Sequence, residues 1–304
     1  MAKPFRHIPV LLHPVLEALR PRPGMTIVDC TLGLGGHSRE IVSKLSPGGT
    51  LIGLDFDPGH VEKSRALLSN LAEPGVALHL RQSNFAALPT VLSEIGVEKV
   101  DGILADVGVA SPQIDDPSRG FSYRRPGPLD MRMDPGRGQP ASVLVNRLTE
   151  AELREAFLEL GDETDAPAIA KLIVERRQVE PITTTEALTA IICEARDFTL
   201  ERAAGAKLHP AARTFQALRM LVNRELPNLQ RLLTVAPELL KPGGRIAIIS
   251  FHSGEDRTVK QALRDGLRSG IYSEVTPEPI TADAAEITEN PRSRSAKLCW
   301  GQRA

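Results

Sequence analysis

Cysteine and aromatic residues are scarce in this chain. Only three of its 304 residues are cysteines, at positions 30, 193 and 299, and aromatic residues make up 4%. The cysteines show no paired spacing, which excludes a disulfide framework and a zinc site of the usual ligand spacing and is typical of a reducing compartment. We therefore expect no metal, and a core packed mainly by aliphatic side chains.

Long apolar runs and a strong net charge are also missing. The apolar run near the start is interrupted by Pro9 and closed by His13 and Pro14, so it is too short for a signal segment, and no later run could span a membrane. We expect a soluble cytoplasmic protein. The formal net charge is −1, so any nucleic-acid binding must come from local patches of charge.

A glycine-rich turn follows the first apolar run. Residues 27–38 read IVDCTLGLGGHS, a strand pattern ending at Asp29, then Gly33, Gly35 and Gly36, then the start of a helical pattern. Glycine permits positive φ angles and close approach of the backbone to a ligand, and free N–H groups at a helix start would face that ligand. The pattern predicts a nucleotide-like pocket at the end of the first strand, although a turn that binds nothing has the same appearance.

A second strand pattern, 50–55, ends at Asp55, 19 residues after Gly36. An acid about 20 residues beyond such a turn binds ribose hydroxyls. Ser38 stands where a dinucleotide-binding motif has its third glycine, and Asp29 at the strand tip would repel a pyrophosphate. An acid there suits the amino group of S-adenosylmethionine, so the pocket is interpreted as a methyl-donor site.

Strand and helix patterns alternate up to residue 106, which predicts a parallel sheet with right-handed crossovers. The alternation stops in a loop of about 107–140 rich in Gly, Pro, Asp and Arg, and helical patterns follow, with N-caps expected at Thr149 and Thr183. A strand at 245–250 resumes the sheet, and a closing antiparallel strand is expected at 295–301. We predict three segments: a first part of the sheet domain (1–111), a loop and helical insertion that recognises substrate (112–208), and a second part (209–304).

Several motifs together resemble one known family. They are the turn at 29–38, DVGVASPQ at 106–113, RGFS at 119–122, GPLDMRMD at 127–134, HPAARTFQA at 209–217, SFHSGEDR at 250–257 and NPR at 290–292. In this order, over nearly the whole chain, they are similar to the bacterial-type small-subunit (16S) rRNA cytosine-N4 methyltransferases. The resemblance implies a Rossmann-like class I α/β methyltransferase fold with an inserted helical domain. It also implies N4-methylation of a cytidine in the decoding region of 16S rRNA.

The resemblance assigns donor-binding residues one by one. S-adenosylmethionine, with S-adenosylhomocysteine as product, would contact the loop amides and the residues Gly35, Gly36, His37, Asp55, Phe85, Asp106 and Gln113, beside Asp29 and Gly33 of the same turn. Asp106 would lie next to the sulfonium and Phe85 beside the adenine. Plain alternatives remain open: Asp55 as a helix-entry acid, Phe85 as a core residue and His37 as a helix-start residue.

The basic residues are unevenly distributed. Residues 202–224 carry five cations, including Lys207, Arg213 and Arg219, and 292–303 carry four, including Arg292 and Arg294, with no acid in either stretch. Both are interpreted as phosphate contacts, with a solvated face as the alternative. In the loop 115–137, Arg and Asp alternate, so we expect them to hold the loop together. Arg119, Phe121 and Tyr123 are the candidate RNA contacts of this loop, with the two aromatic rings available to stack on an extruded base.

The chemistry requires the target amine to be held and aimed at the methyl group, with acceptors near its protons. The chain lacks the Asp/Asn-Pro-Pro-Tyr motif of other amino-methyltransferases, so the candidates are Asp106 and, five and six residues later, Ser111 and Pro112. His13-Pro14 stands where the family usually has an acid.

The partner would be small-subunit rRNA or the small ribosomal subunit; the oligomeric state stays open, with a homodimer among the options. An NAD-dependent oxidoreductase and a non-catalytic RNA-binding module are the competing hypotheses.

Overall fold

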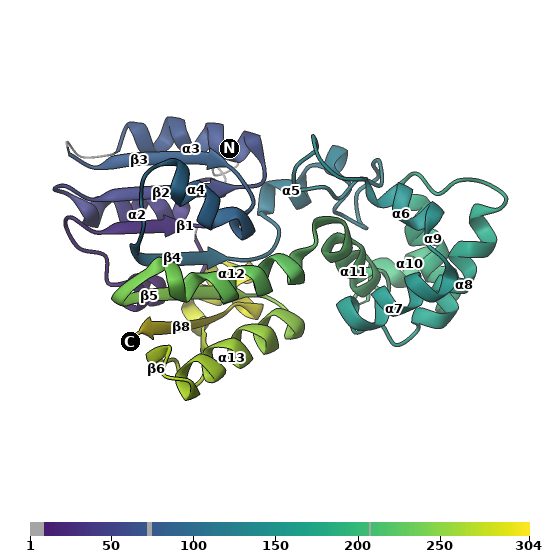
Figure 1. Cartoon of the computed structure of the whole chain (residues 1–304). Helices are drawn as coiled ribbons and strands as arrows, with labels where there is room; N and C mark the ends of the chain where they lie inside the picture. The colour runs from purple at the N-terminus through teal and green to yellow at the C-terminus, as the bar shows by residue number, and fades with distance from the viewer. Residues whose placement is uncertain (1–8, 72–74, 207) are drawn as a thin grey trace. The chain divides into compact units, whose positions relative to one another are not determined.

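The computed structural model describes residues 9–71, 75–206 and 208–304, so Lys207 and the first residues of the expected N-terminal segment lie outside it. The chain forms two compact units (Figure 1). Unit 1 comprises Met1–Gly108 and Leu226–Ala304, and unit 2 comprises Val109–Glu225. Among the described residues, no helix combines the length and the apolar character needed to cross a bilayer.

Unit 1 is built on one mixed sheet with the strand order β3-β2-β1-β4-β5-β8-β6, with β7 paired to β8 (Figure 1). Strands β1 to β5 pair in parallel, and β8 pairs antiparallel to β5 as the tail pattern predicted. The Rossmann-like α/β prediction is therefore confirmed. The strands are β1 (Thr26–Asp29), β2 (Thr50–Asp55), β3 (Ala77–Gln82), β4 (Val100–Asp106), β5 (Leu240–Ser250), β6 (Tyr272–Val275), β7 (Ile280–Thr281) and β8 (Lys297–Arg303).

Alternate residues of each strand pack into different cores, because successive side chains of a strand point to opposite faces. One core contains Val28 together with residues of α4 (Leu88–Glu94), α12 (Glu225–Leu239) and α13 (Ser253–Arg268). The other contains Ile27 together with residues of α1 (Leu12–Leu19), α2 (Gly36–Leu45) and α3 (Pro58–Ser69). The remaining short elements are η1 (Phe85–Ala87), α14 (Ala284–Glu289) and η3 (Pro291–Ser295). Helices on both faces leave only the strand ends for a ligand.

Unit 2 is helical. Its elements are α5 (Ser111–Asp115), η2 (Pro117–Arg119), α6 (Ala141–Arg147), α7 (Glu150–Gly161), α8 (Ala166–Arg177), α9 (Thr185–Ala195), α10 (Leu200–Ala204) and α11 (Ala212–Asn223). Thr149 forms the expected capping box with Glu152. The expected cap at Thr183 is wrong by one residue, because it is the Thr184 hydroxyl that accepts the Ala187 N–H.

The two units divide at different residues from those the sequence suggested. Unit 2 begins at Val109 instead of 112 and runs to Glu225 instead of 208, so it includes α11. The reason is local packing of α11 on α7. At Gly161 a Cβ atom would lie only 2.6 Å from the Arg213 carbonyl oxygen, so the last turn of α7 lies directly against the backbone of α11. Strand β5 also begins earlier than predicted, at Leu240.

Candidate functional site

Three aspartates end adjacent strands at the carboxyl edge of the sheet in unit 1. Asp29 closes β1, Asp55 closes β2 and Asp106 closes β4, and β1 lies between the other two strands. The carboxyl ends of parallel strands are where open α/β sheets bind ligands. The structure therefore brings together the acids that the sequence pattern placed at strand ends.

Asp29 is almost fully buried and fixes the start of the glycine turn. Its Oδ2 accepts a hydrogen bond from the Ser38 hydroxyl at 2.7 Å, and its Oδ1 accepts from the Thr31 backbone N–H at 3.1 Å. Burial raises the pKa of Asp29, while the Ser38 hydrogen bond opposes the increase. Ser38 thus stands where a dinucleotide-binding motif has its third glycine, and its hydroxyl binds Asp29.

Asp55 connects the glycine turn to the second strand. Its Oδ2 accepts the Gly33 N–H at 2.7 Å, its Oδ1 accepts the Asp57 N–H at 2.8 Å, and His60 Nδ1 lies 3.3 Å from the same Oδ1. Asp57 also caps α3, where its side chain accepts the Gly59 N–H. Each carboxylate oxygen can accept more than one hydrogen bond, so these contacts leave acceptor capacity for a ligand hydroxyl.

The turn itself requires glycine at two positions. Gly33 has a φ of 52° and Gly35 a φ of 78°, both in the left-handed region that glycine adopts without strain. Gly35 is the N-cap of α2, and a Cβ there would lie 3.3 Å from the Ser64 hydroxyl. Gly36 opens the helix, so the first N–H groups of α2 have no partner within the helix and can face a ligand.

Asp106 differs from the other two acids because one of its carboxylate oxygens has no hydrogen-bond partner in the part of the chain that the structure describes. Its Oδ1 is buried and receives no hydrogen bond from any described residue, while its backbone N–H donates to the Thr31 hydroxyl at 2.6 Å. Burial raises the pKa of Asp106 to about 6; Asp29 and Glu255 add to the increase and His37 opposes it. An unpaired buried carboxylate oxygen is costly, which marks it as a candidate for contact with a ligand or substrate.

His37 lies between Asp106 and the N-terminal segment. Its Nε2 is 2.9 Å from the Val10 carbonyl oxygen, so Nε2 carries a proton and donates to it. Its Nδ1 lies 3.8 Å from Asp106 Oδ2, and the side chain is 7% exposed. The ring is thus held in one orientation beside Asp106, which is more than a helix-start role requires.

Phe85 follows the third strand in η1, where Asn84 caps the turn. The ring packs edge-on against Phe56, with centroids 6.3 Å apart, and the residue is 8% exposed. It belongs to the core cluster that includes Val28 and α4. Core packing is therefore the main role that the structure displays for Phe85.

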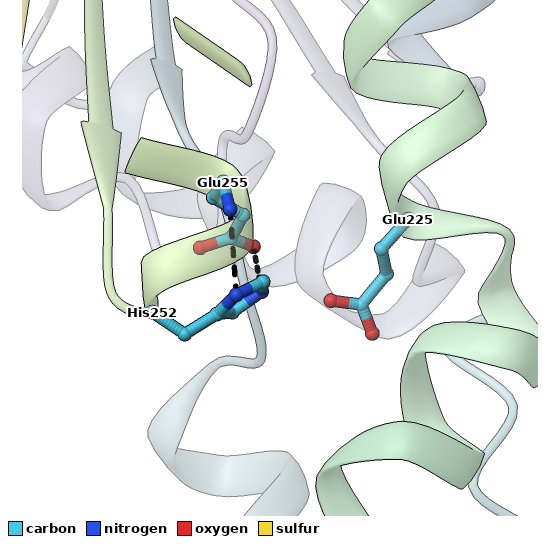
Figure 2. Close-up of side chains that lie close together, drawn as sticks. All are labelled: Glu225, His252 and Glu255. Atoms are coloured by element: carbon cyan, nitrogen blue, oxygen red, sulfur yellow. Dashed lines mark hydrogen bonds and ion pairs between the residues drawn. The ribbon is translucent and has the colours of Figure 1, made fainter. Parts of the chain in front are cut away.

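The sequence interpretation missed a His–Glu pair after β5. His252 caps α13 through Nδ1, which accepts the Glu255 N–H, and its Nε2 lies 3.0 Å from Glu255 Oε1 (Figure 2). Glu255 is 1% exposed, and its Oε2 accepts the Phe251 N–H at 3.0 Å. This arrangement resembles a capping box with His in place of Ser, a spacing that could have been noticed at 252–255.

Glu225, also drawn in Figure 2, belongs to unit 2, where its carboxylate accepts two hydrogen bonds from Arg219.

The predicted residues Ser111, Pro112 and Gln113 form the first turn of α5 in unit 2. The Gln113 side chain is buried, and its Oε1 accepts the Ala110 N–H at 3.1 Å. Gln113 thus shapes the chain that leaves β4 by fixing the helix entry. Its proposed contact with the donor remains a prediction.

The arginine-rich loop of unit 2 is held together internally, as expected. Arg119 donates to the carbonyls of Arg132 and Met133, and Arg132 binds both carboxylate oxygens of Asp130 at 2.7 and 2.8 Å. A Cβ at Gly127 would overlap the Pro117 carbonyl, which shows how closely the loop packs. Arg119, Arg132 and Asp130 therefore bind other groups of the same loop.

The two aromatic residues of that loop do not present free ring faces on which a base could stack. Phe121 is 8% exposed, beneath the Arg119 guanidinium. Tyr123 stacks on His209 with centroids 4.5 Å apart and meets Phe215 edge-on. The rings are already used in packing within unit 2, so the structure does not support base stacking on Phe121, and Tyr123 would first have to leave His209.

Of the five cations named for phosphate contact, the four that the structure describes fall into two groups. Arg219 is 17% exposed and binds Glu225 through two hydrogen bonds of 2.8 Å, so its charge is neutralised. Arg213 donates to the Asp162 carbonyl and is partly exposed, and Arg292 and Arg294 lie exposed on η3. The interpretation of Arg219 as a phosphate contact is therefore unsupported, while the other three remain candidates.

The chain matches the MraW methylase family over residues 4–304. It is 46% identical over 299 residues to the ribosomal RNA small subunit methyltransferase H of Acidobacterium capsulatum, covering 96% of this chain and 97% of that protein. It is 44% identical over 309 residues to the protein of the same name from Symbiobacterium thermophilum (97% and 95% covered). For the Deinococcus radiodurans protein of that name, identity is 45% over 300 residues (99% and 90% covered).

Proposed function

Because the chain belongs to the MraW methylase family, we propose that it transfers a methyl group from S-adenosylmethionine to N4 of a cytidine in the decoding region of small-subunit (16S) rRNA. The substrate class follows the names of its relatives, and the atom and the region follow the resemblance of its motifs. The substrate is free rRNA or the small ribosomal subunit, and S-adenosylhomocysteine is the second product. Cells would carry out this reaction in the cytoplasm.

The observation that carries the proposal is the set of carboxylates at the sheet edge. Asp29, Asp55 and Asp106 gather there, and the buried Oδ1 of Asp106 has no partner among the described residues. A cationic ligand such as a sulfonium with its α-amino group would be stabilised by these charges, whereas a dinucleotide pyrophosphate would be repelled. The charges therefore favour a methyl donor over NAD as the ligand. They also argue against the hypothesis of a non-catalytic RNA-binding module.

In this proposal the donor supplies an electrophilic methyl group on sulfur. The amides at the start of α2 and the carboxylate of Asp29 hold its methionine end, Asp55 accepts from the ribose, and the edge of Phe85 lies beside the adenine. Asp106 faces the reacting centre. As the N–CH₃ bond forms and the S–CH₃ bond breaks, the amine nitrogen becomes positive, and Asp106 stabilises that charge and accepts the proton the nitrogen must lose.

Mass mapping of methylated nucleosides in 16S rRNA tests the function. Cells lacking the protein should lose one N4-methylcytidine, identified against C5- and 2′-O-methylcytidine standards, and the wild-type gene should restore it. Restoration by a chain carrying Asp106→Asn at equal abundance would contradict the assignment of the site. An unchanged methylation map in the deletion strain would reject the proposed reaction itself.

Asp55→Ala is expected to weaken binding of S-adenosylmethionine by about 1–3 kcal/mol, because it removes an acceptor for the ribose and also the anchor of the Gly33 amide. Isothermal calorimetry gives the affinity, and circular dichroism confirms the fold. Asp55→Asn is the matched control, since it keeps one acceptor oxygen and should lose less. Equal affinities of the wild-type and Ala proteins would remove Asp55 from the site.

Donor affinity should depend on pH through Asp106. Because its pKa is raised to about 6, the carboxyl is ionised above this pH and neutral below it. A cationic donor prefers the ionised form, so its affinity should fall, by at most about tenfold per pH unit, as the pH drops below 6. Calorimetry between pH 5 and 8 measures the profile. The Asp106→Asn protein should lose this part of the dependence, and an identical profile in both proteins would assign it to another group.

A further inference from the structure

Helix α13 carries an uneven charge that a count along the sequence conceals. Residues 253–268 contain four cations and three acids, a net charge of only +1. Burial separates the two signs. Glu255 is 1% exposed and Asp256 is 7% exposed, both on the side that packs against the sheet, and the third acid, Asp265, is paired with Arg268. The solvent side of the helix is therefore cationic.

Three cations of α13 lie on one stripe. Arg257, Lys260 and Arg264 follow one another at intervals of three and four residues, the spacing that places side chains on one helix face. Arg257 and Arg264 are exposed, and the described residues include no hydrogen-bond or ion-pair partner for either guanidinium. Their donors are therefore available to an external acceptor.

Strand β8 adds a fourth cation beside this stripe. The buried Asp256 carboxylate binds Lys297 of β8 at 2.9 Å and Lys260 of α13 at 3.5 Å through the same oxygen. Burial and Asp256 raise the pKa of the Cys299 thiol to about 11, and the charges of Lys260, Lys297 and Arg264 act against the increase. Arg257, Lys260, Arg264 and Lys297 together are called the α13 basic face.

The α13 basic face continues toward another pair of exposed cations. The element η3, with Arg292 and Arg294, directly precedes β8, so Arg294 is three residues from Lys297 along the chain. With a total formal charge of −1, the protein has no global field to attract a polyanion. A row of cations, two of which the buried Asp256 holds in place, provides a local attraction instead.

We propose that the α13 basic face binds the phosphodiester backbone of the RNA substrate, at nucleotides other than the one that is methylated. The proposal rests on the proposed function, because it assumes an RNA substrate. Exposed arginines present planar donor pairs that match phosphate oxygens, and lysines add point charges. Helix α13 exposes one large apolar side chain, Leu267 near its C-terminal end, and no aromatic ring. A face made mainly of cations is typical of backbone contact without base reading and untypical of a protein interface core.

The test compares two double variants of equal charge. Arg257→Gln/Arg264→Gln removes two cations from the α13 basic face. The control, Lys44→Gln/Lys63→Gln, removes two exposed cations from α2 and α3, which pack on the opposite face of the sheet. Both variants change the net charge equally. All four side chains are exposed, so the melting temperatures should match that of the wild type.

Filter binding of 16S rRNA at several KCl concentrations provides the readout. For the α13 variant, the slope of log affinity against log salt should decrease in magnitude by about two, and binding should weaken severalfold at low salt, with donor affinity unchanged. The control should keep the wild-type slope. Equal slopes for all three proteins would overturn the proposal, and so would weaker binding of ribosomal subunits with unchanged binding of bare rRNA, which would indicate an acidic protein partner.

The proposal and the proposed function fail in different ways. If the chain does not methylate 16S rRNA, the wild-type protein gives no methyl transfer to it under any condition. If only the inference is wrong, the wild type and the α13 variant methylate the RNA with the same KM. If it is right, the variant has a raised KM for RNA and an unchanged kcat at saturating RNA, because the face includes none of the residues assigned to the reacting centre.

Discussion

Asp106→Asn is expected to slow methyl transfer by about 10²–10³, the usual cost of losing one preorganised polar group aimed at developing charge. The substitution preserves the shape of the side chain but replaces one carboxylate oxygen by an amide donor. Oδ1 of Asp106 is the buried oxygen that has no partner among the described residues, and burial holds the pKa of the group at about 6. Asn can neither take up a proton from the amine nor offset a positive charge on it.

Single-turnover methyl transfer at saturating donor is the decisive measurement, because it separates chemistry from binding. The backbone N–H of residue 106 still reaches the Thr31 hydroxyl in the variant, so the end of β4 should keep its structure. Ser111→Ala is the comparison. It should cost less if the Ser111-Pro112 backbone, and not the hydroxyl, holds the base edge. Near-normal transfer by Asp106→Asn together with an inactive Ser111→Ala would reverse the two roles.

The sheet could be predicted from the sequence because strand formation depends on local patterns that the chain repeats. Apolar runs such as 50–55 end in an acid and are followed by cap signals, and each of these signals acts within a few residues. The assignment of α11 to unit 2 depends instead on how Gly161 lets α7 approach α11 at Arg213, a contact between positions 52 residues apart. No local pattern carries that information.

The same contrast applies to the candidate site. Asp29, Asp55 and Asp106 were predictable because their positions follow from strand ends, which parallel pairing then aligns. Whether each side chain is paired or buried was not predictable. Arg219 pairs with Glu225, and Phe121 is buried, although both belong to motifs with the composition of an RNA-binding surface. Pairing and burial also give α13, which carries a net charge of only +1 by count, a cationic solvent side. A charge count along the sequence can therefore overestimate or underestimate the charge that a surface presents.

Arg196→Met is expected to destabilise unit 2 by about 3–5 kcal/mol, the usual result of removing one partner of a buried charge pair. Glu163, between α7 and α8, is 0% exposed, and Arg196 is 21% exposed. Arg196 Nη1 lies 3.5 Å from Glu163 Oε2 and donates to the Pro210 carbonyl at 2.7 Å, while its Nε lies 2.9 Å from Asp165 Oδ2. One guanidinium thus connects the α7–α8 turn, the end of α9 and the segment before α11.

The effect comes from the charge that is left behind and not from the lost contact alone. In the Met variant, the partners that Glu163 keeps among the described residues are the Asp165 N–H at 3.2 Å and the Thr214 hydroxyl at 3.5 Å. The double variant Glu163→Gln/Arg196→Met removes the stranded charge, so it should recover much of the stability, whereas independent effects would simply add. Urea unfolding followed by circular dichroism measures both proteins. A loss below about 1 kcal/mol in Arg196→Met would show that Glu163 finds solvent or another donor, and that the pair contributes no more than a surface ion pair does.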